Sequence, residues 1–163
     1  ALFLLNNELQ FAPCNKIRLA SSLKYSNLPF SIIYMAKQMI KTDKAPAPIG
    51  PYNQAIKANG MIFVSGQVAF DPISGELKMG SIQEETTQVM KNLEAILAEA
   101  GIGFAHIVKT SIFLSDMSLF AAVNEVYGAY FEGLIAPARE TVAVKTLPRN
   151  VNVEISMIAV ETI

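Results

Sequence analysis

The chain has 163 residues, of which 52% are hydrophobic and 17% charged, a composition that excludes intrinsic disorder and predicts one globular domain with its own core. Thirteen Lys and Arg residues nearly balance fourteen Asp and Glu residues, so the net charge of −1 predicts no general attraction to nucleic acid or to an anionic membrane. A single Cys (Cys14) and a single His (His106) cannot build a structural zinc site, which needs about four nitrogen or sulfur ligands.

The first 34 residues differ in composition from the rest and are interpreted as an N-terminal extension outside a domain at residues 35–163. They contain three bases, one acid and several serines, whereas residues 35–163 contain ten bases and thirteen acids. Two interpretations stay open: an organelle transit peptide, or an overextended start that precedes a true first residue at Met35. We expect a cytoplasmic protein, or a mitochondrial or plastid one if residues 1–34 are a transit peptide. The apolar stretch Leu28–Ala36 is too short to span a membrane.

Three prolines and one glycine fall within Ala45–Tyr52, which excludes a helix there and predicts a stiff, extended segment. Beyond it, Gln54–Ala58 and Met61–Phe70 are predicted as strands. Asn59-Gly60 between them is typical of a two-residue hairpin turn, because both central residues of such a turn need positive φ. The two strands are therefore expected to pair antiparallel.

A turn at Asp71–Gly75 and a short strand at Glu76–Lys78 are predicted before the first helix. Ser81, followed three residues later by Glu84, matches a capping box and predicts where this helix begins. Apolar residues then recur at steps of three or four on one helical face, and Gly101 supplies the glycine that commonly ends a helix.

The rest of the chain alternates strands with a second helix. His106–Leu114 is predicted as a buried strand, Leu119–Glu132 as a helix, and Glu140–Thr146 and Asn152–Glu161 as strands joined like a hairpin. Helices that each cross between strands imply the α+β class, with a mixed sheet and both helices on one face. The other face is too apolar to be left in water, so we expect a closed homo-oligomer whose copies cover it.

Four polar features interrupt this pattern and are candidates for a site. Arg139 follows a proline at the start of a strand, where its planar guanidinium is suited to a two-pronged ion pair with a carboxylate. Glu154 lies within an apolar strand, Ser65-Gly66-Gln67 interrupts another strand, and Asn124 interrupts the apolar pattern of the second helix. Taken singly, each has a structural explanation, since an arginine at a sheet rim or a solvated glutamate is common.

Taken together, these features form a longer pattern. The segments that carry it are Ile49-Gly50-Pro51-Tyr52, Gln54-Ala55, Val64-Ser65-Gly66-Gln67, Asn92-Leu93 with Leu97, Val123-Asn124-Glu125-Val126-Tyr127, Pro137-Ala138-Arg139, Leu147-Pro148 and Val153-Glu154-Ile155. In their order and spacing they resemble the signature of the Rid family (reactive intermediate deaminases, also called the YjgF family). The resemblance covers about Met39 to Val160, and residues 1–34 lie outside it.

The resemblance implies a chorismate-mutase-like fold assembled as a homotrimer, with three sites in clefts between subunits. It also implies an activity, the hydrolysis of small 2-imino acids such as 2-aminoacrylate/2-iminopropanoate and 2-iminobutanoate to 2-oxo acids and ammonia. No metal and no organic cofactor is implied, and neither nucleic acid nor a membrane is expected as a partner.

The resemblance further implies roles for six residues. Arg139 matches the carboxylate-binding arginine, and Glu154 matches the acid proposed to hold the water. Tyr52, Ser65 and Asn124 match positions that line the site. Thr141 stands where some members carry a cysteine, so it is expected to line the substrate site without thiol chemistry.

The expected hairpin creates a difficulty for this site. If Thr141–Thr146 paired with Val151–Val160, Glu154 would lie opposite about Val144, several residues from Arg139. The site would then draw its residues from different layers or chains. Two other functions stay open: a non-catalytic trimer that binds small carboxylates or acts as a holdase, and an endoribonuclease or translation inhibitor.

Overall fold

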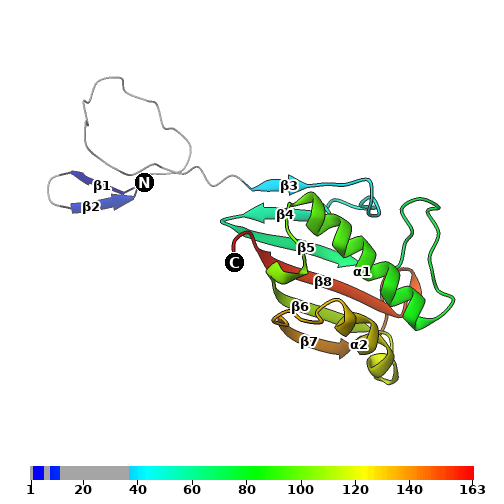
Figure 1. The fold of residues 1–163 in the computed structure, drawn as a ribbon. Coiled ribbons are helices and arrows are strands. Elements are labelled where there is room, and N and C mark those ends of the chain that lie inside the picture. Colours follow the sequence, from blue (N-terminus) through cyan, green and yellow to red (C-terminus); the bar gives the residue numbers. More distant parts are fainter. Residues whose placement is uncertain (1, 6–7, 12–36) are drawn as a thin grey trace. The chain divides into compact units, whose positions relative to one another are not determined.

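The computed structural model describes residues 2–5, 8–11 and 37–163 (Figure 1). The chain divides into two units, Ala1–Ile33 and Tyr34–Ile163. In the first unit, strand β1 (Leu2–Leu5) pairs antiparallel with β2 (Glu8–Phe11), a pairing that sequence analysis did not predict. The remainder of the predicted extension over residues 1–34 lies outside the described residues.

The second unit is a six-stranded sheet in the order β3-β4-β5-β8-β6-β7, with two helices on one face (Figure 1). Neighbouring strands are antiparallel except β6 and β7, which are parallel. The predicted α+β class, with a mixed sheet and both helices on one face, is therefore confirmed. The elements are β3 (Gln38–Ile40), β4 (Ala55–Ala58), β5 (Met61–Gln67), α1 (Ile82–Glu99), β6 (Ile107–Leu114), α2 (Phe120–Ala129), β7 (Ala138–Ala143) and β8 (Val153–Val160).

Local signals account for several of these elements. Asn59 and Gly60 have φ values of 55° and 72°, as the predicted turn between β4 and β5 requires. The Ser81 hydroxyl accepts a hydrogen bond of 3.1 Å from the backbone N–H of Glu84, and so caps α1. Strand β3 was not predicted, and the strand expected at Glu76–Lys78 is only an isolated bridge.

The predicted hairpin of the last two strands is wrong. Strand β7 pairs with β6, and β8 lies between β5 and β6. Strand β8 pairs with β5 on one side and with β6 on the other, whereas β7 pairs only with β6 and forms an edge of the sheet. The connection contains Arg149 and Asn150, whose left-handed φ values of 60° and 57° turn the chain away from β7.

The register of the sheet places the two predicted chemical groups on opposite faces. Arg139 on β7 lies beside Thr110 of β6, and Thr110 is buried under Tyr127 of α2, so both belong to the helix face. Glu154 on β8 lies beside Phe113 of β6, on the face without helices. Because paired residues share a face, no single chain can bring Arg139 and Glu154 into one site through this sheet.

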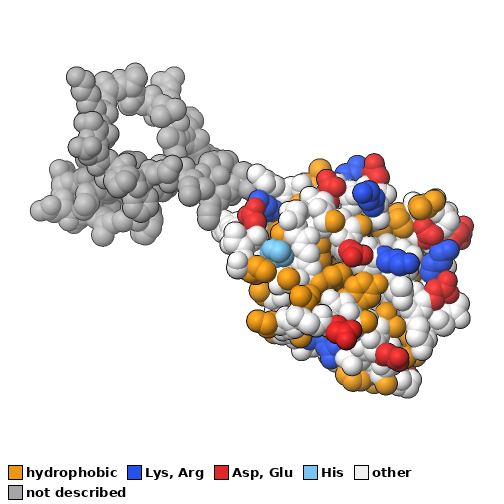
Figure 2. All heavy atoms as spheres, viewed as in Figure 1, with side chains coloured by type: hydrophobic (Ala, Val, Ile, Leu, Met, Phe, Trp, Pro, Cys, Tyr) orange, Lys and Arg blue, Asp and Glu red, His pale blue; other side chains and the backbone are white. Residues whose placement is uncertain are grey.

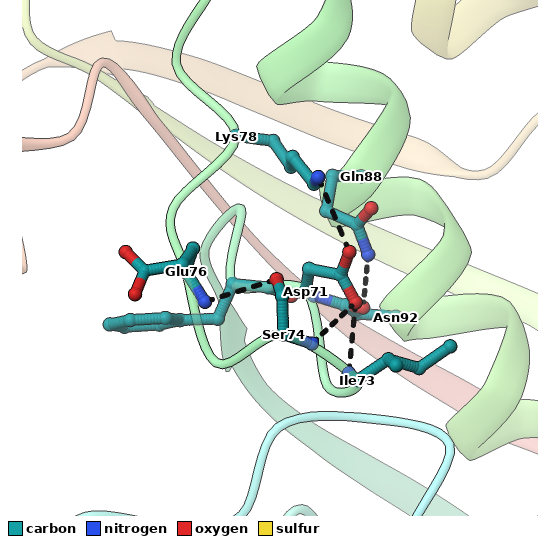
Figure 3. A network of polar contacts seen from close by, with 8 residues as sticks. Asp71, Ile73, Ser74, Glu76, Lys78, Gln88 and Asn92 are labelled. Atoms are coloured by element: carbon teal, nitrogen blue, oxygen red, sulfur yellow. Dashed lines mark hydrogen bonds and ion pairs between the residues drawn. The ribbon is translucent and has the colours of Figure 1, made fainter.

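Two polar contacts from α1 fix the loops that surround the sheet, and Figure 3 shows the surroundings of the first, made by Asn92. Asn92 donates from Nδ2 to the carbonyls of Phe70 (2.8 Å) and Val68 (3.1 Å), and the neighbouring Asp71 accepts from the N–H of Ile73 (2.9 Å). That N–H bond is the main reason why the pKa of Asp71 is lowered. The Asn92 hydrogen bonds hold the turn after β5 against the helix, and the Asp71 hydrogen bond lies within that turn.

The second contact fixes the start of β8. The Glu85 carboxylate is buried and accepts hydrogen bonds from the backbone N–H groups of Asn152 (2.6 Å) and Val153 (3.2 Å). It also accepts from Nδ2 of Asn152 at 2.9 Å. Glu154 follows Val153 directly, so this contact with α1 helps to fix the position of Glu154 in β8.

Candidate functional site

Two cavities contain five of the six predicted site residues. The first, of about 440 Å³, will be called the Glu154 cavity. Its walls come from the proline-rich segment, β5, the turn after β5, the β7–β8 connection and β8. The residues that line it are Pro46, Ala47, Ile49, Tyr52, Gln54, Ser65, Gly66, Gln67, Val68, Phe70, Pro148, Arg149 and Glu154.

The second cavity, of about 420 Å³, will be called the Arg139 cavity. It is formed by α2 and by the chain that leads into β7. The residues that line it are Asn124, Tyr127, Gly128, Phe131, Ala136, Pro137 and Arg139. Among the residues that the structure describes, no cluster of His, Cys, Asp and Glu could hold a metal ion.

A buried amide holds the proline-rich wall of the Glu154 cavity. Gln54 is 2% exposed, and its Nε2 donates to the carbonyls of Thr42, Ala45 and Pro46 at 2.9 to 3.0 Å. Its Oε1 accepts from the N–H of Thr42 at 2.8 Å. Gln54 was not among the predicted site residues, although a polar residue at the start of an apolar strand is a signal that could have marked it.

Tyr52 and Ser65 both line the Glu154 cavity. The Ser65 hydroxyl donates to the carbonyl of Asn53 at 2.7 Å, which leaves its oxygen free to accept a hydrogen bond. The Tyr52 hydroxyl accepts from the N–H of Ile49 at 3.4 Å and so keeps its own proton available to donate. The pair can therefore bind polar groups of opposite hydrogen-bonding character.

Glu154 is half-buried among the mostly apolar residues of this cavity. Burial raises the pKa of its carboxyl group, because the charged form loses hydration. Among the described residues it has no ion-pair partner within 4 Å. A carboxyl group of this kind exchanges a proton nearer to neutral pH than an exposed glutamate does, which suits a general base or acid.

Arg149 also lines the Glu154 cavity, and sequence analysis did not single it out. It is the only basic residue in the lining, and its backbone is in the left-handed region. A bulky residue with positive φ is uncommon, but nothing in the sequence around Leu147 to Asn150 predicts that conformation.

The Arg139 guanidinium is held in a fixed position on the other face of the sheet. Its Nη1 donates to Oδ1 of Asn124 at 2.7 Å. Its Cζ lies 5.0 Å from the ring centroid of Tyr127 and 5.8 Å from that of Phe120, within range of cation–π attraction. Arg139 has no ion-pair partner within 4 Å among the described residues, so its remaining N–H groups are available to a carboxylate.

Thr141 lies two residues after Arg139 on the same face of β7, beside Ile112 of β6. Its Oγ1 is buried and has no hydrogen-bond partner among the described residues. A buried hydroxyl without a partner is costly, so this group is suited to a partner from outside the chain.

We therefore predict opposite effects of Thr141→Val on stability and on turnover. Removing the unpaired hydroxyl should raise the free energy of unfolding by about 1 kcal/mol, measured by urea denaturation. If the hydroxyl binds substrate, kcat/KM should fall about three- to tenfold. Unchanged kcat/KM would remove Thr141 from the site.

The predicted residues thus fall into two separate groups within one chain. Tyr52, Ser65 and Glu154 lie together, and Asn124 and Arg139 lie together. The register explains the separation, because the two groups lie on opposite faces of the sheet. A site that uses both groups needs two chains.

The chain is similar to proteins of one family over most of its length. The family described as Endoribonuclease L-PSP matches residues 42–161. A RutC family protein of Synechocystis is 52% identical over 77% of this chain and 98% of its own length. The 2-iminobutanoate/2-iminopropanoate deaminase of Mus musculus is 49% identical over 77% of this chain and 92% of its own length. The chloroplastic Reactive Intermediate Deaminase A of Arabidopsis thaliana is 41% identical, over 91% of this chain and 80% of its own.

The same fold occurs in solved structures. A protein of unknown function from the Rid family of Yersinia pestis superposes with a TM-score of 0.75 at 46% identity, over 77% of this chain and 99% of its own. The superposition confirms the fold that the sequence resemblance implied.

Proposed function

Because the chain belongs to the Rid family, we propose that it hydrolyses small 2-imino acids to 2-oxo acids and ammonia. The observation that carries this proposal is the fixed guanidinium of Arg139, whose free N–H groups suit the carboxylate of such a substrate. The mouse relative is described as a deaminase of 2-iminobutanoate and 2-iminopropanoate, whereas the Synechocystis relative is described only as a RutC family protein.

In the proposed reaction, Arg139 holds the substrate carboxylate and directs C2 toward a water molecule. Glu154 accepts a proton as the water oxygen bonds to C2 and the C=N double bond becomes a single bond. That proton passes to the nitrogen and gives a carbinolamine. The remaining proton of the former water then leaves the hydroxyl group and reaches the nitrogen as the C=O bond forms and the C–N bond breaks, which releases the 2-oxo acid and ammonia. Tyr52, Ser65, Asn124 and Thr141 are assigned to substrate binding.

We further propose that this site forms between the subunits of a homotrimer. Arg139 and Glu154 lie on opposite faces of one sheet, so a shared site requires two chains. The face without helices carries Phe63 and Val142, each 43% exposed, beside Phe113 and Ile158. A second copy that covers this row removes apolar surface from water.

Mixed trimers test this arrangement. Arg139→Ala and Glu154→Gln chains, coexpressed with different tags and purified through both tags, should regain about a third of wild-type activity. A cyclic trimer of both kinds has one interface in three with both native residues. Each variant alone should be almost inactive. Mixed trimers no more active than the separate variants would place both residues in one chain.

The activity is tested with freshly generated 2-aminoacrylate or 2-iminobutanoate, produced by a pyridoxal-phosphate dehydratase with and without this protein. Faster release of ammonia supports the proposal. Binding of 2-oxobutanoate without faster release would identify a non-catalytic carboxylate binder. Cleavage of RNA would instead favour the endoribonuclease named in the family description; the face shown in Figure 2 carries scattered acidic and basic side chains and no continuous basic stripe.

The compartment is also a proposal: cytoplasmic, unless residues 1–34 direct import into an organelle. The alignment with the chloroplastic relative takes in 91% of this chain and so includes part of those residues. In the described part of the chain, no helix is long and apolar enough to cross a membrane. A fusion of residues 1–34 to a fluorescent protein in plant cells should stay diffuse in the cytosol; accumulation in plastids or mitochondria would identify a transit peptide.

A further inference from the structure

We propose that Gly66 is a positioning residue for Glu154: its missing side chain creates the space in which the Glu154 carboxyl group lies against the backbone of β5. This inference rests on the proposed function, because it assigns Glu154 a role in turnover. The proposed reaction does not explain why a glycine stands between Ser65 and Gln67, and this inference supplies a reason.

The geometry of this contact is close. A Cβ atom on Gly66 would overlap Oε1 of Glu154 and would lie 2.8 Å from its Cδ and 3.0 Å from its Cγ. Real Cβ atoms essentially never approach other heavy atoms more closely than 3.0 Å. Any side chain at position 66 therefore excludes the Glu154 carboxyl group from its observed place.

The backbone does not explain the glycine. Gly66 does not have a positive φ, so an alanine can adopt its φ without strain. The pairing of β5 with β8 is irregular between Val64 and Gln67, which brings this stretch of β5 out of the regular register. The remaining reason for a glycine at this position is the space that the Glu154 carboxyl group occupies, which any side chain would fill.

An alanine at position 66 is therefore expected to move Glu154 rather than the strands, because the colliding atoms belong to a flexible side chain. Glu154 pairs with Phe113 on β6 and shares its cavity with Tyr52 and with Arg149, the only other charged residue in the cavity lining. A carboxyl group displaced toward solvent loses the burial that raises its pKa and no longer faces the assembled site.

Gly66→Ala should lower kcat/KM for 2-iminobutanoate about ten- to a hundredfold, the cost of displacing a catalytic group by about 1 Å. The acid limb of the pH profile should move to lower pH. Gly103→Ala is the matched control, because a Cβ there meets nothing within 4 Å and Gly103 lines neither cavity. Its activity should equal that of wild type.

A double-mutant cycle separates positioning from a general structural effect. In the Glu154→Gln background, Gly66→Ala should cause little further loss, because the group on which it acts is already absent. Independent losses in the two backgrounds would overturn the proposal. So would wild-type kcat/KM and an unmoved acid limb in Gly66→Ala.

Two further results keep the test decisive. If Gly66→Ala does not fold, Gly66→Ala/Glu154→Ala removes the colliding side chain and should fold; failure of this double variant to fold would overturn the proposal. If wild-type protein does not accelerate ammonia release, the proposed function fails. The contact itself is then tested by the crystal structure of Gly66→Ala, in which Glu154 should occupy a different rotamer.

Discussion

Replacing Arg139 by alanine is expected to lower kcat/KM for 2-iminobutanoate by about a hundred- to a thousandfold, because Arg139, which is exposed in the single chain, forms its ion pair with the substrate in the proposed cleft between two chains. The guanidinium is already fixed by Asn124, Tyr127 and Phe120, so it loses little freedom when a carboxylate binds. Ammonia release from freshly generated imine, followed as a function of substrate concentration, measures the effect.

Arg139→Lys should recover only part of this loss, because an ammonium group cannot form the two parallel hydrogen bonds of a guanidinium. Lys91→Ala, a change at an exposed position of α1, is the control for removing a positive charge and should leave kcat/KM unchanged. Arg139→Ala should keep its oligomeric state in sedimentation velocity. Wild-type turnover by intact Arg139→Ala would remove this residue from the mechanism.

Glu154→Gln is expected to lower kcat about a hundred- to ten-thousandfold, the range typical of a lost general acid or base. The amide keeps the shape of the side chain and its hydrogen-bonding capacity but cannot take up the proton of the attacking water. KM should change little if Arg139 supplies most of the binding. A small loss of kcat with a large rise of KM would instead make Glu154 a binding residue.

The pH profile gives an independent measure of Glu154. A general base must be ionised, so kcat/KM should fall as the pH drops through its pKa. Burial raises that pKa, and the acid limb should therefore lie at higher pH than an exposed glutamate would give. The residual activity of Glu154→Gln should lack this limb. An acid limb that persists in Glu154→Gln would assign it to another group.

Stability should move in the opposite direction. Burial places the folded-state pKa of Glu154 above its unfolded-state pKa, so the protonated form favours folding. The free energy of unfolding therefore decreases as the pH rises from the unfolded-state pKa through the folded-state pKa. Above it, the ionised group is a net cost to the folded state. Glu154→Gln removes that cost and should be at least as stable as wild type at neutral pH, in contrast to its loss of activity.

Much of the fold could be predicted because its signals are local. The Asn59-Gly60 turn and the Ser81 cap depend on the conformations of single residues and on neighbours a few positions away. Which face each helix buries follows from periodicity in the same way. The candidate residues were selected because they interrupt an apolar pattern and together match a long signature, and their roles stay predictions.

Strand order could not be predicted from local signals. Strand β8 lies between β5 and β6, which are far from it in sequence, and its burial on alternate residues fits a central strand as well as one arm of a hairpin. The choice depends on the left-handed connection at Arg149 and Asn150 and on pairing energies over the whole sheet.

The amino-acid sequence by itself determined the α+β class, the apolar face that lacks helices, and the residue types of the candidate site. Only the tertiary structure decided that Arg139 and Glu154 lie on opposite faces and that Gly66 clears a place for the carboxyl group. The reason is physical: side-chain alternation is set by each strand alone, but which side chains become neighbours is set by register and strand order, and these follow from long-range pairing.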